Sequence, residues 1–186
     1  TRLWSGSADA KAPEAPHLYR IGEYWYLMIA EGGTERGHAV SIARAPSPSG
    51  PFEPYPANPI LTHRGIEHPV QNTGHADLVQ GPDDGWWLVF LGVRPGGGTP
   101  GWHVLGRETF LAPVEWIDGW PVVGDVVNDL SAVPWKLEEP LAEPVRDDFD
   151  ESTLRPQWIS LRDRPEELCT TRERAGWLAA RARGEC

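Results

Sequence analysis

Two similar hairpin patterns, 58 positions apart, constrain the fold of this chain more than any other feature. The first runs from His17 to Ala30 with a turn at Gly22, and the second starts at His75, turns at residues 81–85 and continues as WWLVFLG. Each joins two short runs of aromatic and aliphatic residues, which is typical of antiparallel strands. A repeat of several short strands is typical of β-propeller blades, because a four-stranded blade needs neighbours to cover its faces. The sequence therefore predicts an all-β chain that contains part of a propeller.

Further strands are expected beside these hairpins. HAVSIAR (residues 38–44) follows the first, while VLGRETFL (104–111) and a short VEW (114–116) follow the second. The stretch PSPSGPFEPYPANPIL between them has too many prolines for a helix or a central strand. At nearly 60 residues per blade, the chain supplies only about two of the roughly four or more blades that a propeller needs. Because it also begins at Thr1, with Met28 as its only methionine, we expect a fragment.

Composition changes after residue 133. Residues 134–146 combine proline and charge without periodicity, which is typical of an interdomain linker. From residue 147 aromatic and apolar residues return among turn-forming residues, so a second β domain is predicted over residues 147–186. A short amphipathic helix over ERAGWLAARARGEC (173–186) is the alternative for its end. The predicted propeller part therefore comprises residues 1–133.

Charge and composition exclude several classes of protein. A formal net charge of −10 and a pI near 5 argue against nucleic-acid binding, which relies on clustered Lys and Arg. No apolar run approaches the roughly 20 residues that span a bilayer, so no membrane segment is expected. Cys169 and Cys186 lack the spacing of a zinc site or a disulfide framework. The histidines His38, His63, His68 and His103 also lack the spacing of metal ligands, so no structural zinc is expected.

Three segments carry polar residues at or near the start of strand runs, where a propeller side chain can point toward the central axis. They are EAPHLYR with Glu14, TGHADLV with His75, and LGRETFL with Arg107. Glycoside hydrolysis needs a protonated carboxylic acid and a second carboxylate that activates water or attacks the sugar. Glu14 lies between two prolines and beside aromatic-rich strands, so we expect it to be desolvated, as a general acid requires.

Each candidate has a structural alternative. Glu14 alone is also consistent with a solvated loop acid, His75 with a satisfied core histidine, and Arg107 with an ion pair to Glu108. We expect His17 to bond to the backbone at its strand start. Structural or peripheral roles are expected for Asp77 and Glu31. Trp25, Trp86 and Trp87 are expected in the blade core, with stacking of one of them on a sugar ring as the alternative.

Several separated segments resemble glycoside hydrolase family 43, of the β-xylosidase and α-L-arabinofuranosidase type. They are EAPHLYRIGEYWYLMIAEGGTERGHAVSIARA, NPILTHR, TGHADLV and LGRETFLAPVEWIDGWP, and they occur in the family's order over roughly residues 2–125. The resemblance implies a five-bladed β-propeller and an inverting, exo-acting enzyme that releases xylose or arabinofuranose from hemicellulose-derived oligosaccharides. The tail from Asp147 resembles the start of the β-sandwich that such enzymes append.

The resemblance also implies roles for individual residues. Glu14 falls on the general acid of the family motif EGPH, but Ala15 replaces the glycine. If that position needs a positive φ, alanine costs about 1 kcal/mol in strain. The substrate-binding positions fall on His75, Arg107 and Thr34. The general-base Asp and a third Asp are implied to lie outside this chain, so we expect the isolated chain to show little or no hydrolysis.

No cofactor is expected. The resemblance suggests a central calcium ion for some members, and this stays open as the lesser alternative, although no acidic loop here resembles a cage of the about six to eight oxygen ligands that calcium takes. The implied partner is a xylo- or arabino-oligosaccharide, with no nucleic acid and no membrane, and exposed blade edges leave homo-oligomerisation open. Two other functions remain: a non-catalytic carbohydrate-binding propeller or pseudo-enzyme, and another five-bladed glycosidase such as an arabinanase or a fructan-active enzyme.

Overall fold

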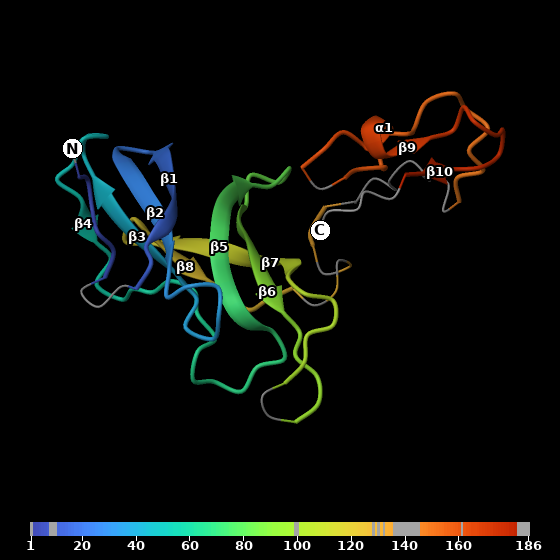
Figure 1. Ribbon diagram of the computed structural model, residues 1–186. Helices are drawn as coiled ribbons and strands as arrows, with labels where there is room; N and C mark the ends of the chain where they lie inside the picture. Colours follow the sequence, from blue (N-terminus) through green and yellow to red (C-terminus); the bar gives the residue numbers. More distant parts are fainter. Residues whose placement is uncertain are drawn as a thin grey trace. The chain divides into compact units, whose positions relative to one another are not determined.

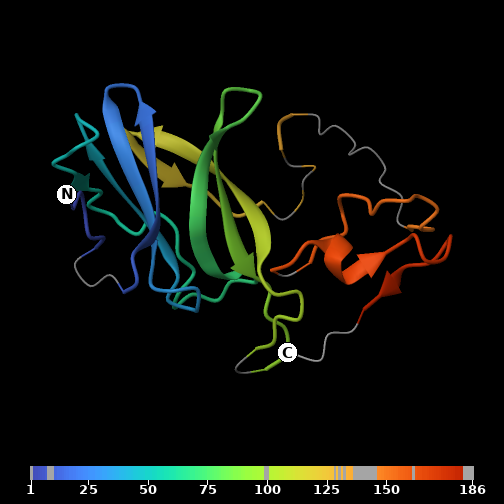
Figure 2. The same cartoon turned by 45° about the horizontal axis from the view of Figure 1, so that its top comes forward.

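The computed structural model in Figure 1 describes residues 2–7, 11–98, 101–127, 129, 131, 133–135, 146–160 and 162–181. The chain divides into two compact units, residues 1–136 (unit 1) and 137–186 (unit 2). Unit 1 contains strands β1–β8 in two four-stranded antiparallel sheets, which Figure 2 separates into a blue and teal sheet and a green and yellow one. The predicted all-β fold with a partial propeller is therefore confirmed.

The first sheet follows the first hairpin pattern. Its strands, in spatial and sequence order, are β1 (Glu14–Ile21), β2 (Tyr24–Glu31), β3 (Ala39–Ala45) and β4 (Glu53–Pro54). Gly22 adopts a φ of 59° in the β1–β2 turn, a left-handed conformation that glycine accepts without strain. The proline-rich stretch contributes only the two residues of β4, as its composition predicted.

The second sheet has the same order. Its strands are β5 (Gln71–Gln80), β6 (Trp86–Val93), β7 (Glu108–Ile117) and β8 (Trp120–Val123). The runs at residues 104–111 and 114–116 belong to one strand from Glu108 onward, while residues 104–107 lie in a turn before it. Pro113 lies inside β7, and its carbonyl accepts a hydrogen bond from the Gly124 N–H at 2.8 Å. The N–H and C=O of a residue in an antiparallel strand point to the same neighbouring strand. In Pro113 this is the β8 side, so its missing N–H removes no hydrogen bond between β7 and β6.

A single hydrophobic core joins the two sheets. Met28, Ile42, Leu88 and Phe90 belong to it and are almost fully buried. Residues Tyr26 to Glu31 of β2 are buried on both faces, although an alternating pattern is usual for a sheet with one wet face. A strand inside a blade is covered by neighbouring blades on both sides, so its apolar run is continuous.

The two sheets also meet through polar contacts between their first strands. The Tyr19 hydroxyl in β1 accepts a hydrogen bond from the Leu78 N–H at 3.1 Å and donates one to Asp77 Oδ1 at 3.3 Å. His17 Nδ1 lies 2.8 Å from the same carboxylate oxygen. The expectation that His17 bonds to backbone is wrong: its partner is the Asp77 side chain, because β5 passes close enough to offer a charged acceptor.

Replacing Tyr19 by phenylalanine is expected to destabilise the protein in a pH-dependent way. Burial raises the pKa of Tyr19 to about 12, with Asp77 acting in the same direction and the Leu78 hydrogen bond against it. Because the folded state holds this proton more tightly than the unfolded chain, whose tyrosine pKa is about 10, the stabilisation is complete below pH of about 10 and is lost toward about 12. We expect the variant to lose about 1 kcal/mol at pH 7.

Urea unfolding at several pH values measures this effect. The difference in unfolding free energy between wild type and Tyr19→Phe should shrink as the pH rises from about 10 toward 12. A difference that stays constant over that interval would show that the hydroxyl proton does not contribute.

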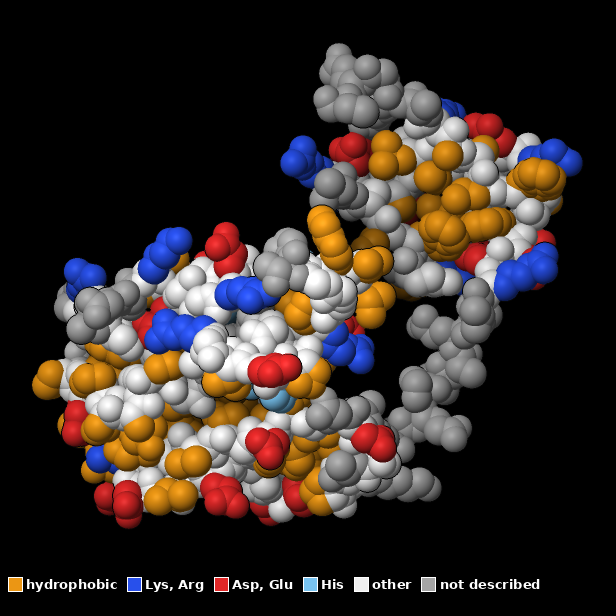
Figure 3. Space-filling model, turned by 90° about the horizontal axis from the view of Figure 1, so that it is seen from below, with side chains coloured by type: hydrophobic (Ala, Val, Ile, Leu, Met, Phe, Trp, Pro, Cys, Tyr) orange, Lys and Arg blue, Asp and Glu red, His pale blue; other side chains and the backbone are white. Residues whose placement is uncertain are grey.

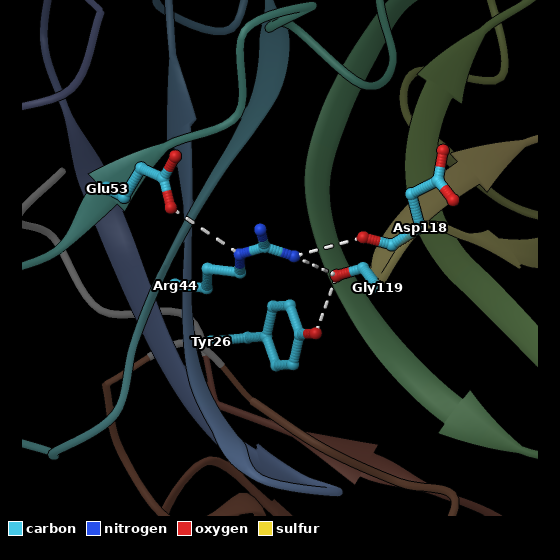
Figure 4. A network of polar contacts seen from close by, with 5 residues as sticks. All are labelled: Tyr26, Arg44, Glu53, Asp118 and Gly119. Carbon is cyan, nitrogen blue, oxygen red and sulfur yellow. Dashed lines mark hydrogen bonds and ion pairs between the residues drawn. The ribbon is translucent and has the colours of Figure 1, made fainter.

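A second contact between the sheets centres on Arg44 and is drawn in Figure 4. Arg44 Nη1, from β3, donates to the carbonyl oxygens of Asp118 and Gly119 in the β7–β8 turn, at 3.1 Å each. The Tyr26 hydroxyl donates to the Gly119 carbonyl at 2.6 Å. The guanidinium also lies over the Trp120 ring, 4.1 Å from its centroid. We call these contacts the Arg44 network.

Unit 2 is small in its described part. It contains α1 (Pro165–Leu168) and the antiparallel pair β9 (Cys169–Thr170) and β10 (Ala179–Ala180). The alternative of a helix over residues 173–186 is not seen in the described part of that range, where β10 lies. Most of the predicted linker, residues 134–146, lies outside the described residues. No helix within the described ranges is long and apolar enough to cross a bilayer.

Candidate active site

The four predicted site residues come from four separate segments of unit 1. Glu14 opens β1, His75 lies in β5, Arg107 immediately precedes β7, and Thr34 follows β2. Strands β1 and β5 are the first strands of their sheets, and both begin at the lower end of unit 1 in Figure 1. All four side chains are exposed. In the view from below (Figure 3), the larger body exposes acidic side chains and a histidine among hydrophobic ones.

A β-bulge sets the direction of Glu14. Glu14 pairs with Ala30 and His17 pairs with Met28, so the register shifts between them. Ala15 lies in this bulge with a φ of 48°. The expectation that the position needs a positive φ is therefore met, and alanine bears a strain of about 1 kcal/mol that glycine would avoid.

Glu14 is less enclosed than the sequence predicted. Its side chain is exposed and borders a mostly apolar hollow of about 370 Å³, whose walls include Trp4, Pro13, Pro16 and Leu27. The expectation that the neighbouring prolines and strands desolvate Glu14 is wrong for these residues alone. Glu14 lines this hollow, yet its side chain stays exposed to solvent.

His75 lies on the most irregular part of β5. The register with β6 shifts between Gln71 and Gly74 and again between Gly74 and Asp77. His75 itself has a φ of 52°, which is uncommon for a residue with a side chain. Its side chain is exposed, so the alternative of a satisfied core histidine is excluded. The double bulge points His75 outward from a strand whose neighbours are buried.

His38 lies beneath this bulge and was not predicted as a site residue. Only 1% of its surface is exposed, and its Nδ1 lies 3.0 Å from the Asn72 carbonyl oxygen. A Cβ added at Gly74 would lie 2.5 Å from three atoms of the His38 ring, so the ring packs directly on the glycine backbone. The sequence signal was the glycine before His75, which marks a close approach by another group.

Electrostatics connect His38 with three of the four predicted residues. Burial is the main cause that lowers the pKa of His38, while the Asn72 hydrogen bond raises it. Smaller effects come from His75 and Arg107, which lower this pKa, and from Glu14, which raises it. Such effects fall off with distance, so Glu14, His75 and Arg107 each lie within electrostatic range of His38.

Arg107 forms no ion pair with the adjacent Glu108. Glu108 instead accepts hydrogen bonds from Arg94, from Nε at 3.0 Å and from Nη2, and these lower the pKa of Glu108. The alternative of an Arg107–Glu108 ion pair is therefore wrong, because Arg94 reaches Glu108 from the end of the paired strand. Within the described residues, Arg107 makes no hydrogen bond or ion pair, so its guanidinium group is available to bind a ligand.

Thr34 and Glu31 lie at the end of β2. Thr34 is exposed in a loop that closes tightly, since a Cβ at Gly32 would lie 1.9 Å from the Gly37 carbonyl oxygen. No contact joins Thr34 to the other predicted residues in the described part of the chain. The buried Glu31 carboxylate accepts hydrogen bonds from Ser41 Oγ at 2.5 Å and from Ser7 Oγ at 2.9 Å. Glu31 thus ties Ser7 to the sheet, just after residues 2–5, which line the hollow beside Glu14.

Near Glu14, His75 and Arg107, the carboxylate that the described contacts identify on β5 is that of Asp77. Asp77 lies on the neighbouring strand, yet His17 and Tyr19 occupy it. Across the described ranges, no group of three or more His, Cys, Asp or Glu side chains could hold a metal ion. A carboxyl group, an imidazole and an unpaired guanidinium are groups that can exchange protons and hydrogen-bond a polar ligand.

Comparison with known proteins gives the family. The sequence profile of glycosyl hydrolases family 43 matches residues 1–121. A non-reducing end α-L-arabinofuranosidase of Bacteroides ovatus, BoGH43B, is 46% identical over 187 residues, which cover 95% of this chain and 34% of that protein. A β-xylosidase of Bacillus subtilis is 42% identical over 167 residues, covering 83% and 31%.

Solved structures of similar proteins support the same family. The xylan β-1,4-xylosidase of Bacillus halodurans C-125 matches with a TM-score of 0.82 at 34% identity, over 98% of this chain and 36% of that one. The chain spans about a third of the length of the curated relatives it matches. The resemblance found in the sequence motifs is thus confirmed, and the chain belongs to glycosyl hydrolase family 43.

Proposed function

We propose that this chain supplies the proton-donating half of the active site of a longer, exo-acting glycosidase. The whole protein releases xylose or arabinofuranose from hemicellulose-derived oligosaccharides, with Glu14 as general acid and inversion at the sugar carbon. The observation that carries this proposal is that Glu14 and His75 are exposed on the bulged parts of β1 and β5, two strands that begin at the same end of unit 1 (Figure 1). The names of the relatives, arabinofuranosidase and β-xylosidase, support the substrate class.

The chemistry assigns a role to each group. Glu14 gives its proton to the oxygen of the leaving group as the glycosidic bond breaks. Arg107 and His75 bind hydroxyl groups of the sugar whose bond is cleaved, and Thr34 lines the same pocket. Inversion needs a second carboxylate about 6.5–9.5 Å away, which deprotonates the attacking water. Since Asp77 is occupied, we propose that this base belongs to a part of the whole protein outside the 186 residues.

An activity panel tests the proposal. The whole protein and the isolated 186 residues are assayed on nitrophenyl xyloside, nitrophenyl arabinofuranoside and arabinan. We expect the whole protein to hydrolyse one or both nitrophenyl glycosides and to release single sugars from oligosaccharides, while the isolated chain shows little or no turnover. A proton donor without an activated water supplies only half of the reaction.

Other outcomes identify the alternatives. Cleavage of arabinan alone would make the protein an arabinanase, and sugar binding without turnover would make it a carbohydrate-binding pseudo-enzyme. Turnover of a xyloside by the isolated 186 residues would contradict the proposal that the base lies elsewhere.

A further inference from the structure

His38 is held in one tautomer by its surroundings. A carbonyl oxygen can only accept a hydrogen bond, so Nδ1, 3.0 Å from the Asn72 oxygen, carries the proton. Burial lowers the pKa of His38, which keeps the ring neutral near pH 7. Nε2 is then an acceptor, and it is buried without a hydrogen-bond partner among the described residues. An apolar side chain would avoid this orphaned atom, so core packing alone does not explain a histidine here.

The contacts of His38 fall on the strained part of β5. Asn72 and His75 have φ values of 57° and 52°, and the register with β6 shifts on both sides of Gly74. His38 bonds to the carbonyl of Asn72 and packs its ring against Gly74, the residue immediately before His75. It therefore contacts both ends of the segment whose conformation decides where His75 points.

His38 is itself anchored on the other side. Its own carbonyl accepts a hydrogen bond from Thr62 Oγ1 at 2.9 Å, and it leads directly into β3, whose next residues are buried. Residues in left-handed conformations are strained and persist only when their surroundings hold them. A His38 ring fixed by a buried strand can hold Asn72 and His75 in this way.

We propose that His38 is a positioning residue of the sugar-binding pocket: its Nδ1 hydrogen bond to Asn72 and its ring contact with Gly74 fix the bulge that presents His75 to the substrate. This inference rests on the proposed function, because it takes His75 as a sugar-binding group. His38 acts through His75 and does not touch the substrate.

Three substitutions of His38 in the whole protein separate its contributions. Asparagine places an amide N–H as many bonds from Cα as Nδ1, so His38→Asn can keep the bond to Asn72. Glutamine places its amide at the position of Nε2 and loses the Nδ1 donor, while phenylalanine keeps only a ring. We expect His38→Gln and His38→Phe to raise KM about tenfold with kcat within about threefold, and His38→Asn to stay within about threefold of wild-type KM.

A double-mutant cycle tests whether His38 acts through His75. In a His75→Ala background, His38→Gln should change KM by less than about twofold, because the group that it positions is gone. The matched control is His63→Gln, which removes another buried Nδ1 bond, 2.7 Å to the Val70 carbonyl, and should leave KM unchanged. A full tenfold effect in the His75→Ala background, or rescue by glutamine in place of asparagine, would overturn the proposal.

A crystal structure of the His38→Gln variant gives a readout without activity. We expect Asn72 and His75 to leave their left-handed conformations and the His75 side chain to change direction. An unchanged bulge would overturn the positioning role even if the whole protein hydrolyses no glycoside. Absence of wild-type turnover, in contrast, would remove the proposed function and leave this structural result to decide on His38.

Discussion

Replacing Glu14 by glutamine in the whole protein is expected to lower the turnover of xylo- or arabino-oligosaccharides by about a hundred- to ten-thousand-fold. Glutamine keeps the size and the hydrogen-bonding oxygen of the side chain but has no proton to give to the leaving group. Sugar binding should change little, since in this proposal Arg107 and His75 hold the sugar. Kinetics on an unactivated disaccharide, with product binding measured by calorimetry, separate the two effects.

The leaving group provides an internal comparison. A dinitrophenolate departs without protonation, so a dinitrophenyl glycoside should lose much less activity in Glu14→Gln than a disaccharide does. Glu23→Gln is the matched control, because Glu23 is an exposed glutamate in the β1–β2 turn, and it should behave as wild type. Equal losses on both substrates, or near-normal turnover of the disaccharide, would remove Glu14 from its role as general acid.

The Arg44→Met substitution is expected to have the largest effect on stability, about 2–4 kcal/mol. Methionine keeps most of the aliphatic length but leaves the Asp118 carbonyl without its donor and removes the charge over the Trp120 ring. The Arg44 side chain is only 17% exposed, so water replaces these contacts poorly. Urea unfolding, followed by tryptophan fluorescence, should show a lower midpoint with an unchanged slope.

The contact of Arg44 with Glu53, outside the Arg44 network, should contribute much less to stability. The Glu53 carboxylate lies 3.6 Å from Arg44 Nε, too far for a hydrogen bond, and the Glu53 side chain is 65% exposed. Such a pair contributes little, so Glu53→Gln should cost less than about 0.5 kcal/mol. Equal losses for the two variants would mean that the ion pair, and not the link to the β7–β8 turn, stabilises the sheets.

The strands were predictable where the sequence pattern is local. The hairpins at Gly22 and at residues 81–85 follow from turn residues between apolar runs, and the structure has both. The continuity of β7 was not predictable in this way. Whether Pro113 interrupts a strand depends on which side its nitrogen faces, and the partner Gly124 sets that side.

The candidate site was predictable where a residue type carries chemistry, and less so where tertiary contacts decide. The positive φ of Ala15 followed from the motif, whereas the partner of Glu108 did not, because Arg94 reaches it only once β6 and β7 pair. His38 was overlooked since it has neither metal spacing nor exposure. The role of His38 depends on tertiary contacts with β5, namely its hydrogen bond to Asn72 and the packing of its ring on Gly74.

The contact between Tyr19 and Asp77 joins positions 58 residues apart, the same spacing as the two hairpin patterns. One position on a blade therefore touches its own counterpart on the next. Successive blades that carry such a contact at equivalent positions follow one another with a repeated rotation, as copies do around a symmetry axis. Together with the shared core and the Arg44 network, the Tyr19–Asp77 contact fixes how the second sheet lies against the first.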